Sequence, residues 1–363
     1  MSTLLHVITH LSAGGAERQL SYLASELARR GHSVHVAYLY SGNDPAIEPN
    51  LTDAGVVLHQ LDFAHNYDPR LLFQLHRLIR RLNPDVIQSW ILHSDVIAGL
   101  IATFPMRKTS RPWIIREPNW PEVQPTFKMR LRCALARRAT AVIANSNTGL
   151  SFWKERYPLK KTGVIRNGFP VEKIIQGCAA PAHAIDRDFV LFVGRLHAQK
   201  NVENTIDAIA YLPDGIVLLI CGTGPLFDSL RNRVRVRGLQ DRVLFMGVLS
   251  PSDIWCQMKQ ALALVLVSHY EGFPNVLVEG MLNLCPLVVS DIAPHREFLH
   301  EDTACFVDQT NPRSIADGIL NAVHKGKENA VRAFPVARRL TVEAMTDQYE
   351  TIYSAAAHQH RNR

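Results

Sequence analysis

The sequence lacks the features that mark several common classes of protein. Its six cysteines are scattered, with no C-x-x-C pair and no compact Cys/His cluster, which argues against structural zinc and predicts reduced thiols in a cytosolic compartment. No stretch approaches the roughly 18 uninterrupted apolar residues that a membrane-spanning helix needs. Residues 4–11 are apolar but short and follow no basic segment, so we expect a first strand there and not a signal peptide.

The sequence also shows no recognisable nucleic-acid-binding module, although it is basic. The net charge is +7, and the excess lies in residues 1–170, where 21 Lys and Arg face 12 Asp and Glu; the remaining residues carry −2. A basic first half predicts an anionic partner for that half, either a membrane surface or a phosphorylated acceptor, and no nucleic acid. Charge that serves only solubility explains the imbalance equally well.

The pattern that is present is an alternation of apolar runs with amphipathic stretches. At 363 residues the chain is too long for one ordinary core, so two domains are expected. The rhythm pauses near Asn167-Gly168 and a linker-like segment at 176–188, and then restarts. It predicts two α/β units with parallel sheets, which bind ligands beyond the carboxyl ends of their strands. The expected strands are 4–9, 34–39, 84–87, 113–115 and 141–144, then 189–193, 216–221, 243–245, 261–267, 287–290 and 304–307.

Two glutamates flank a strand-to-helix turn in the second half. The apolar run 261–267 ends before Glu271, and Asn275 is a good N-cap for a helix that contains Glu279. Both carboxylates would lie near free backbone N–H groups, which attract anions. Carboxylates that accept sugar hydroxyls, beside amides that accept phosphate, suit a nucleotide sugar. One glutamate favoured by the helix dipole and one loop glutamate explain the pair equally well.

Other loops after expected strands carry cations or glycines. Arg195 follows strand 189–193, and Lys200 lies where the next helix would begin; a guanidinium fork and an ammonium together suit a diphosphate. Gly222 lies in a Gly-Thr-Gly-Pro turn after the next strand. Gly14 and Gly15 follow the first strand but have neither Walker spacing nor a full G-x-G-x-x-G, so a compact turn and a phosphate loop both remain open.

In this order along nearly the whole chain, these motifs resemble those of retaining glycosyltransferase family 4. They read Gly-Gly-Ala-Glu-Arg at 14–18, Val-Ile-Arg-Asn-Gly at 164–168, Gly-Arg-Leu at 194–196 with Lys-Asn at 200–201, Gly-Thr-Gly-Pro at 222–225 and Glu-x₇-Glu. The resemblance implies the α/β GT-B fold, with two Rossmann-like domains that face each other across a cleft. It implies an acceptor domain at 1–170, a donor domain at 186–341, and a C-terminal helix at 342–356 that packs back on the first domain.

The resemblance also implies roles for individual residues. Arg195 and Lys200 would hold the donor diphosphate, Glu279 the ribose hydroxyls, and Glu271 the transferred sugar. The catalytic set would be Glu271, Arg195 and Lys200, with no nucleophile and no metal ligand. The further donor-binding residues would be Gly14, Gly15, Gly194, Gly222, Gly272, Phe273, Pro274, Asn275 and Val276.

On the acceptor side the sequence departs from the family pattern. Many relatives carry a His after the fourth strand of the first domain, where this chain has Arg116, Glu117 and Asn119 as candidates. His93 is a further candidate, although an ordinary packed or loop His fits it better. Residues 273–275 read Phe-Pro-Asn, where many members have Phe-Gly. This form is frequent among bacterial family members that build surface polysaccharides or lipid-linked oligosaccharides, so the resemblance favours an acceptor of that kind.

The resulting expectation is an enzyme that moves a hexose or N-acetylhexosamine from a nucleoside-diphosphate sugar, UDP before GDP, to a saccharide or lipid-linked acceptor. It would need no cofactor or metal and would be cytoplasmic, at the inner face of the membrane if basic helices at 71–82 and 128–139 bind anionic lipid. The alternatives are a small-molecule acceptor, a related-fold epimerase or phosphorylase, and a non-catalytic nucleotide-sugar-binding scaffold.

Overall fold

The computed structural model shows two compact units along the chain. It describes residues 1–12, 14–41, 47–63, 68–103, 111–117, 127–156, 159, 161–178 and 185–361. Unit 1 comprises Met1–Phe169 together with Thr341–Arg363, and unit 2 comprises Pro170–Leu340. Unit 1 is therefore built from both ends of the chain, with unit 2 inserted between them.

Unit 1 contains a parallel sheet whose strand order, within the described residues, is β3-β2-β1-β4-β5-β6-β7. The order reverses direction between β1 and β4, which makes this pair the topological switch point of the unit. The strands are β1 (Thr3–Leu11), β2 (Ser33–Ser41), β3 (Val57–Gln60), β4 (Val86–Trp90), β5 (Trp113–Glu117), β6 (Ala141–Ala144) and β7 (Thr162–Val164).

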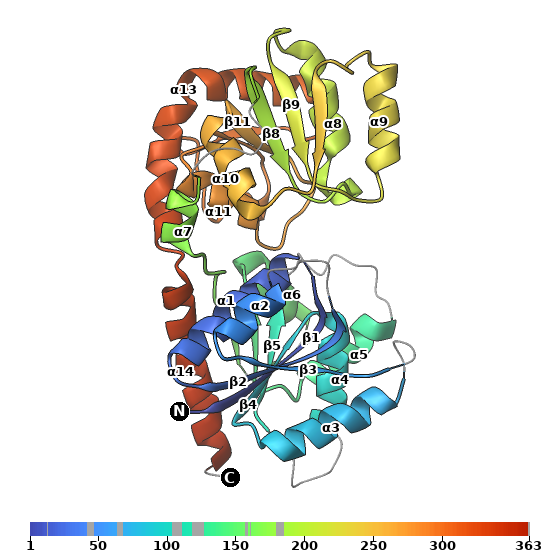
Figure 1. The fold of residues 1–363 in the computed structure, drawn as a ribbon, viewed down its shortest axis with the longest axis vertical. Helices are drawn as coiled ribbons and strands as arrows, with labels where there is room; N and C mark the ends of the chain where they lie inside the picture. The colour runs from blue at the N-terminus through green and yellow to red at the C-terminus, as the bar shows by residue number, and fades with distance from the viewer. Residues whose placement is uncertain are drawn as a thin grey trace. The chain divides into compact units, whose positions relative to one another are not determined.

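Helices cover both faces of this sheet (Figure 1). The helices are α1 (Gly15–Arg29), α2 (Ile47–Asp53), α3 (Arg70–Leu82), α4 (Leu92–Thr103), α5 (Phe127–Ala136), α6 (Asn147–Arg156) and α14 (Val342–Arg361). Alternate residues of each strand point to opposite faces. Leu4 and Ile8 of β1 accordingly pack with α1, α2 and α14, whereas Leu5 and Val7 pack with α3, α4 and α5.

The Asn-Gly pair after β7 secures α14 to unit 1. Gly168 exchanges two hydrogen bonds with the Gln19 side chain, and a Cβ at Gly168 would meet the backbone where α14 begins, at Thr341 and Val342. Asn167 accepts a hydrogen bond from the buried Arg116. This motif therefore has a structural reason for its residue types within unit 1.

Unit 2 contains a second parallel sheet, with the order β10-β9-β8-β11-β12-β13 among the described residues. Its switch point lies between β8 and β11. The strands are β8 (Phe189–Val193), β9 (Val217–Cys221), β10 (Val243–Gly247), β11 (Ala263–Leu266), β12 (Leu287–Ser290) and β13 (Cys305–Val307).

The unit 2 sheet is also covered on both faces. Phe192 and Val265 belong to the core beneath α8, α9 and α13, whereas Leu264 and Leu287 on the other face pack against Gly280 of α11. The helices are α7 (Val171–Gln176), η1 (Ala198–Lys200), α8 (Val202–Ala208), η2 (Ile209–Tyr211), α9 (Phe227–Val236), α10 (Pro251–Gln260), α11 (Asn275–Leu282), α12 (Ala293–Arg296) and α13 (Pro312–Arg338).

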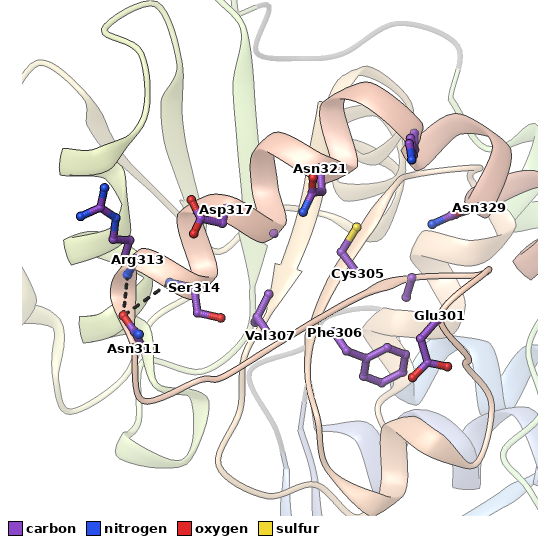
Figure 2. Close-up of a pocket in the computed structure, with 13 residues that line it drawn as sticks. Glu301, Cys305, Phe306, Val307, Asn311, Arg313, Ser314, Asp317, Asn321 and Asn329 are labelled. Carbon is purple, nitrogen blue, oxygen red and sulfur yellow. Dashed lines mark hydrogen bonds between the residues drawn. The ribbon is translucent and has the colours of Figure 1, made fainter.

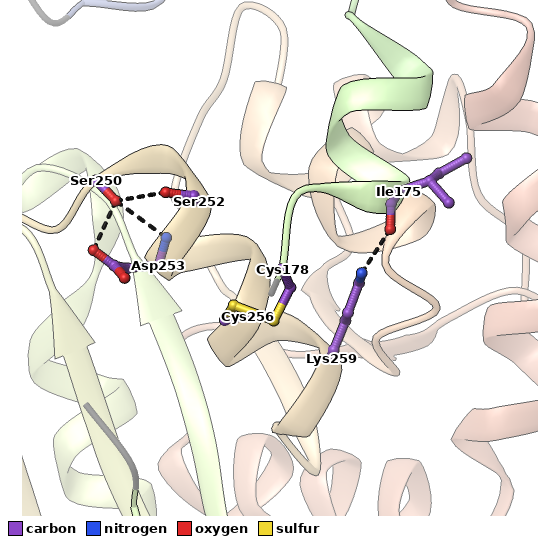
Figure 3. Close-up of a disulfide and its surroundings, with 7 residues drawn as sticks. All are labelled: Ile175, Cys178, Ser250, Ser252, Asp253, Cys256 and Lys259. Atoms are coloured by element: carbon purple, nitrogen blue, oxygen red, sulfur yellow. Dashed lines mark hydrogen bonds between the residues drawn. A yellow bond between two sulfur atoms is a disulfide. The ribbon is translucent and has the colours of Figure 1, made fainter. Parts of the chain in front are cut away.

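One expectation about the cysteines is wrong. Cys178, just after α7, and Cys256 on α10 form a disulfide, although we expected six reduced thiols (Figure 3). The two residues are 78 positions apart and belong to no local cysteine pattern, so their pairing depends on how α7 and α10 lie together in unit 2. Cys133, Cys221, Cys285 and Cys305 are free.

The expectation that the helix at 128–139 binds a membrane surface also needs correction. In α5, the apolar side chains of Met129, Cys133 and Leu135 are buried in the core of unit 1, and Arg132 is buried beside them. The apolar side of this helix is therefore already packed against protein and cannot lie in a lipid surface. In the part of the chain that the structure describes, we find no helix with both the length and the apolar character needed to cross a membrane.

Candidate functional site

The motif residues of unit 2 converge at its switch point. Parallel strands end at the same edge of a sheet, and β8 is paired with β11. The residues after β8 form η1 and lead to Lys200, and those after β11 lead to Glu271. Two motifs 71 positions apart in the sequence thus meet at the carboxyl ends of neighbouring strands.

Lys200 and Glu271 form a direct ion pair in this place. The Lys200 ammonium lies 2.5 Å from Oε1 of Glu271, and the Ser268 hydroxyl donates to the same oxygen at 2.6 Å. The Lys200 side chain remains partly accessible, whereas Glu271 is almost fully buried. The pair therefore consists of a partly accessible cation and a buried carboxylate.

The Glu271 carboxylate is ionised in this setting. Burial by itself raises the pKa of a carboxyl group, because a charge loses its hydration. Here the charge of Lys200 and the hydrogen bonds from Lys200 and Ser268 outweigh burial, and they hold the pKa of Glu271 below its ordinary value. The site thus contains a buried negative charge that is paired with a partly accessible positive charge.

Hydrogen bonds to the backbone fix the two loops in register. The Gln199 side chain donates to the carbonyl of Tyr270 at 2.9 Å, and the Gln199 carbonyl accepts from the His269 N–H at 2.9 Å. Asn201, at φ 53°, donates from its side chain to the carbonyl of Val267 at 3.1 Å. These contacts keep Lys200 opposite Glu271 without help from a ligand.

Arg195 lies beside this cluster in sequence and is exposed. Among the described residues, its side chain makes no ion pair or hydrogen bond. An exposed guanidinium and, five positions further along the chain, a partly accessible ammonium are together able to bind an anion with several oxygens, such as a diphosphate.

The glycines of the adjoining loops are explained first by packing. Gly222, at φ 141°, would place a Cβ against the carbonyl oxygen of Gly194, so the turns after β8 and β9 touch through their backbones. The N–H of Gly194 also donates to the carbonyl of Cys221 at 3.0 Å. Close contact between the two turns brings backbone groups to the edge where Arg195 begins its loop.

Helix α11 supplies the rest of the expected donor site. Gly272, Phe273 and Pro274 are buried in the turn before it, and the Phe273 ring packs edge-on against Phe298 at 4.9 Å. The helix begins at Asn275, one residue earlier than we expected, so Pro274 and not Asn275 occupies the N-cap position. Val276 lies in the first turn, and Glu279 is buried in the second.

In unit 1, Gly14, Gly15 and His93 lie at the switch point of that sheet. Gly15 opens α1 directly after β1, and α4, which carries His93, follows β4 and is tied to β1 by a 3.0 Å contact between the Thr9 and Ser94 hydroxyls. His93 is half-buried, and burial, with the charges of Lys128 and His10, lowers its pKa. These residues occupy an edge where parallel sheets bind ligands.

A strained residue precedes His93. Ile91 has φ 73°, which is unusual for a β-branched side chain. Such strain is often found at functional sites, where the surrounding structure maintains it. The strained backbone at Ile91 is therefore a reason to prefer His93 to the other acceptor-side candidates as a functional residue.

Arg116 and Glu117 have partners inside unit 1. Arg116 is buried and donates to the carbonyls of Ala144 and Ile165 at 3.0 and 2.7 Å. Glu117 is also buried and accepts from Arg132 at 2.6 Å. Both side chains stabilise the sheet, which contradicts our expectation that they are presented to an acceptor; Asn119 lies outside the described residues.

A separate groove lies between β13 and α13 in unit 2. Its volume is about 590 Å³, and polar side chains of α13 line one wall, among them Ser314, Asp317 and Asn321 (Figure 2). It shares no lining residue with the cluster of Lys200 and Glu271. The groove is therefore distinct from the site at the switch point.

Two polar residues that lie near the site in the structure were not predicted from the sequence. Ser290 ends β12, and His295 lies on the short helix α12; both are fully buried. His295 is one of sixteen dispersed histidines and has no partner residue in a recognisable spacing. Only its place after a buried strand of unit 2 could have drawn attention to it.

Two family models match the two units of the chain. The model described as glycosyl transferases group 1 matches residues 179–333, and the model described as Glycosyltransferase Family 4 matches residues 13–173. The two matches cover different halves of the sequence. Together they include every motif at the two switch points.

Curated relatives and solved structures agree with these matches. Glycogen synthase of Mycobacterium tuberculosis is 28% identical over 95% of this chain and 90% of its own length. A Campylobacter jejuni N-acetylgalactosaminyltransferase, whose name specifies a diphospho-undecaprenol acceptor, is 28% identical over 52% of each chain. Crystals of Anabaena Alr3699/HepE with UDP and glucose give a TM-score of 0.83 at 21% identity, over 98% of this chain and 100% of that one.

Proposed function

Because this chain belongs to glycosyltransferase family 4 and has the GT-B fold, we propose that it transfers a hexose or an N-acetylhexosamine from a nucleoside-diphosphate sugar to an acceptor hydroxyl, with retention of configuration. The observation that carries this proposal is the cluster at the unit 2 switch point. There, Lys200 pairs with the buried carboxylate of Glu271, and Arg195, five positions before Lys200 in the same loop segment, is a second, exposed cation.

The donor diphosphate would bind Arg195 and Lys200. Both cations stabilise the charge that develops on the leaving phosphate, an effect that acts mainly in the transition state. Because these side chains can supply that charge, we propose that no divalent metal is required. Activity that persists in excess EDTA is the expected result, and loss of activity that Mg²⁺ or Mn²⁺ restores would contradict it.

The sugar would lie against Glu271 and the turn before α11. An ionised carboxylate close to the anomeric carbon stabilises positive charge on the sugar, and Glu279 would accept hydrogen bonds from the ribose. Neither glutamate acts as a nucleophile in this proposal. The bond from C1 to the phosphate oxygen breaks, the bond from C1 to the acceptor oxygen forms on the same face, and the leaving phosphate takes the acceptor proton.

We propose UDP before GDP as the donor nucleotide and a saccharide or lipid-linked acceptor. Support comes from relatives: solved structures of HepE contain UDP and UDP-glucose, and the Campylobacter enzyme is named for a lipid-linked acceptor. His93 is the residue of unit 1 that we place nearest the acceptor. A small-molecule acceptor remains the second candidate, because a Niallia circulans N-acetyl-D-glucosaminyltransferase that is named for 2-deoxystreptamine is 27% identical over 35% of this chain.

The decisive experiment combines donor binding with product formation. A thermal-shift panel of UDP-, GDP- and ADP-sugars should reveal one class that raises Tm, because a saturating ligand stabilises the folded state. The sugar released or transferred from that donor is then measured with saccharide and polyprenyl-diphosphate acceptors. Tight nucleotide binding without turnover on any acceptor would instead support a non-catalytic scaffold.

We also propose that unit 1 binds the cytoplasmic face of an anionic membrane, through the exposed side of α3 in place of α5. Phe73 is 74% exposed there, next to the exposed Arg77, Arg80 and Arg81. An apolar ring among cations suits anionic lipid. Co-sedimentation with vesicles that contain phosphatidylglycerol should fall when Arg77, Arg80 and Arg81 are changed to Gln. Equal, negligible binding to anionic and neutral vesicles would end this idea.

A further inference from the structure

His295 is a fully buried histidine next to the proposed donor site. It lies on α12, directly after β12, the strand that is paired with β11. Its Nδ1 is 2.9 Å from the carbonyl oxygen of Ser290. A carbonyl only accepts, so Nδ1 carries the hydrogen, and Nε2 of the neutral ring has none. That Nε2 is buried and has no hydrogen-bond partner among the described residues.

A chain of hydrogen bonds connects His295 to Glu271. The ring donates to the Ser290 carbonyl, the Ser290 hydroxyl donates to the Ser268 carbonyl at 2.7 Å, and the Ser268 hydroxyl donates to Glu271 at 2.6 Å. The ends of β11 and β12 are thereby held together. The charges of Glu271 and Lys200 both act on the pKa of the imidazole.

The charges around His295 oppose one another. Burial is the largest influence and lowers its pKa, and the ammonium of Lys200 acts in the same direction. Glu271, the hydrogen bond to Ser290 and the carboxylate of Asp291 raise it, although Asp291 already pairs with Arg296 at 2.7 Å. In the free enzyme the ring is therefore neutral at neutral pH, and Lys200 is the cation that balances Glu271.

Donor binding changes this balance, if the proposed function holds. A diphosphate that binds Lys200 competes with Glu271 for the same ammonium group, and Glu271 has no other cation in hydrogen-bond contact among the described residues. We propose that His295 is a positioning residue for Glu271, which takes up a proton from solvent at Nε2 when Lys200 turns to the diphosphate. Glu271 then remains ionised and in place beside the sugar, with a buried imidazolium as its partner.

The first test needs no donor and measures the charge coupling directly. The pKa of His295 is followed by NMR from its ring Cε1–H signal, which the His295→Asn variant identifies. In Lys200→Met, which keeps the side-chain stem without the charge, the pKa should rise by about one unit or more. Lys327→Met, an exposed lysine of α13, is the control and should leave it unchanged. An unchanged pKa in Lys200→Met would overturn the proposal.

The second test measures protons taken up when a donor binds. UDP-glucose is titrated calorimetrically in two buffers of different ionisation enthalpy at about pH 6.5, near the ordinary pKa of histidine. The diphosphate of UDP-glucose does not itself titrate there. Wild type should take up a fraction of a proton, and Lys200→Met should take up less, because a larger fraction of its rings is protonated before the donor binds.

His295→Asn is the matched variant for this measurement. Its amide can keep the hydrogen bond to the Ser290 carbonyl but cannot be protonated, so a purely structural role for His295 predicts unchanged proton uptake. Our proposal predicts that UDP-glucose still binds and that the uptake is lost; equal uptake in both proteins would refute it. If UDP-glucose and GDP-mannose bind to neither protein, the proposed donor site fails, and the ligand-free titration alone decides the charge coupling.

Discussion

Lys200 is the residue for which two anions compete. In the free enzyme its ammonium pairs with Glu271, and in the proposed complex it pairs with the donor diphosphate. Arg195 has no such partner among the described residues, so it can bind the donor without first breaking a contact. The two cations therefore differ in what donor binding requires of them. Arg195 can bind the diphosphate without losing an ion pair, whereas Lys200 must give up its ion pair with Glu271.

This difference leads to a prediction about turnover. Arg195→Met and Lys200→Met should each lower kcat by roughly 10²–10³, the usual effect of removing a group that stabilises transition-state charge. Lys327→Met removes an exposed lysine of the same unit and serves as the control. Initial rates at saturating donor provide the measurement. Near-normal kcat in both site variants would remove these residues from the mechanism.

Gly222 gives a second prediction at the residue scale. Gly222→Ala would place a Cβ against the Gly194 carbonyl at φ 141°, so we expect a loss of about 1–3 kcal/mol in the free energy of unfolding. The matched control is Gly215→Ala, where a new Cβ meets nothing within 4 Å and φ is not in the left-handed region. Urea unfolding compares the two; equal stability of both variants would show that the turns can separate.

Sequence reasoning at this scale worked where residues belong to local motifs. Lys200 and Glu271 each follow a buried strand, and parallel strands end at one edge, so their approach could be predicted; the role of Arg195 stays a prediction. Arg116 and Glu117 were expected just after a strand, but they are the last two residues of β5, and their side chains contact partners distant in sequence, such as Ile165 and Arg132. His295 was missed because its significance comes from Glu271 and Lys200, which lie on other loops.

Helix α5 carries one buried arginine and one exposed arginine. Arg132 is buried, pairs with Asp95 and Glu117 at 2.7 and 2.6 Å, and lies over the Trp153 ring. Two residues earlier, Arg130 points into solvent. Burial raises the pKa of Asp95 to about 6, even though the charge of Arg132 lowers it. The helix therefore carries the cation on which this buried acidic pair depends.

Removing that cation should be costly. Arg132→Met leaves two buried carboxylates without their common partner, and we expect a loss of roughly 3–5 kcal/mol in the free energy of unfolding. Arg130→Met on the same helix should change it by less than about 0.5 kcal/mol. Chemical denaturation with far-UV circular dichroism would measure both. A small effect at Arg132 would contradict the prediction that the buried carboxylates of Asp95 and Glu117 depend on this partner.

Strands that are buried on both faces were predicted more accurately than strands that are partly exposed. The bounds of β8 and β12 were predicted correctly, because both are continuous apolar runs buried on both faces. Strands β3 and β7 were missed. Both lie at an edge of the unit 1 sheet, are short and partly exposed, and include polar residues such as His59 and Thr162. An edge strand of this kind forms because it pairs with its neighbour in the sheet, and its own sequence has no strong apolar pattern that would predict it.

At the scale of the whole molecule, buried histidines make stability depend on pH. Burial lowers the pKa of His6 to about 3, and His295 is lowered in the same direction. An unfolded chain binds protons at these rings near pH 6.5, whereas the folded chain does not. Between those values the unfolded state binds more protons, so stability is complete above about pH 6.5 and falls as the pH is lowered.

The prediction for His6 follows. The stability lost between about pH 7 and about pH 5 should be smaller in His6→Asn than in wild type, because one ring contributes at most about 1.4 kcal/mol per pH unit. Asn can still accept the hydrogen bond that Trp90 donates to Nδ1 of His6. His324→Asn, an exposed histidine of α13, should keep the wild-type dependence. Urea midpoints across this pH range compare them, and identical pH slopes would contradict the prediction.

The position of α14 has a consequence for synthesis on the ribosome. Met345, Tyr349 and Tyr353 complete the core on one face of the unit 1 sheet, yet they are translated only after the whole of unit 2. While the intervening 171 residues emerge, that face lacks the apolar side chains that α14 contributes to its core. Unit 2 is contiguous and can fold as soon as it leaves the exit tunnel, so the nascent chain should complete its second unit before its first.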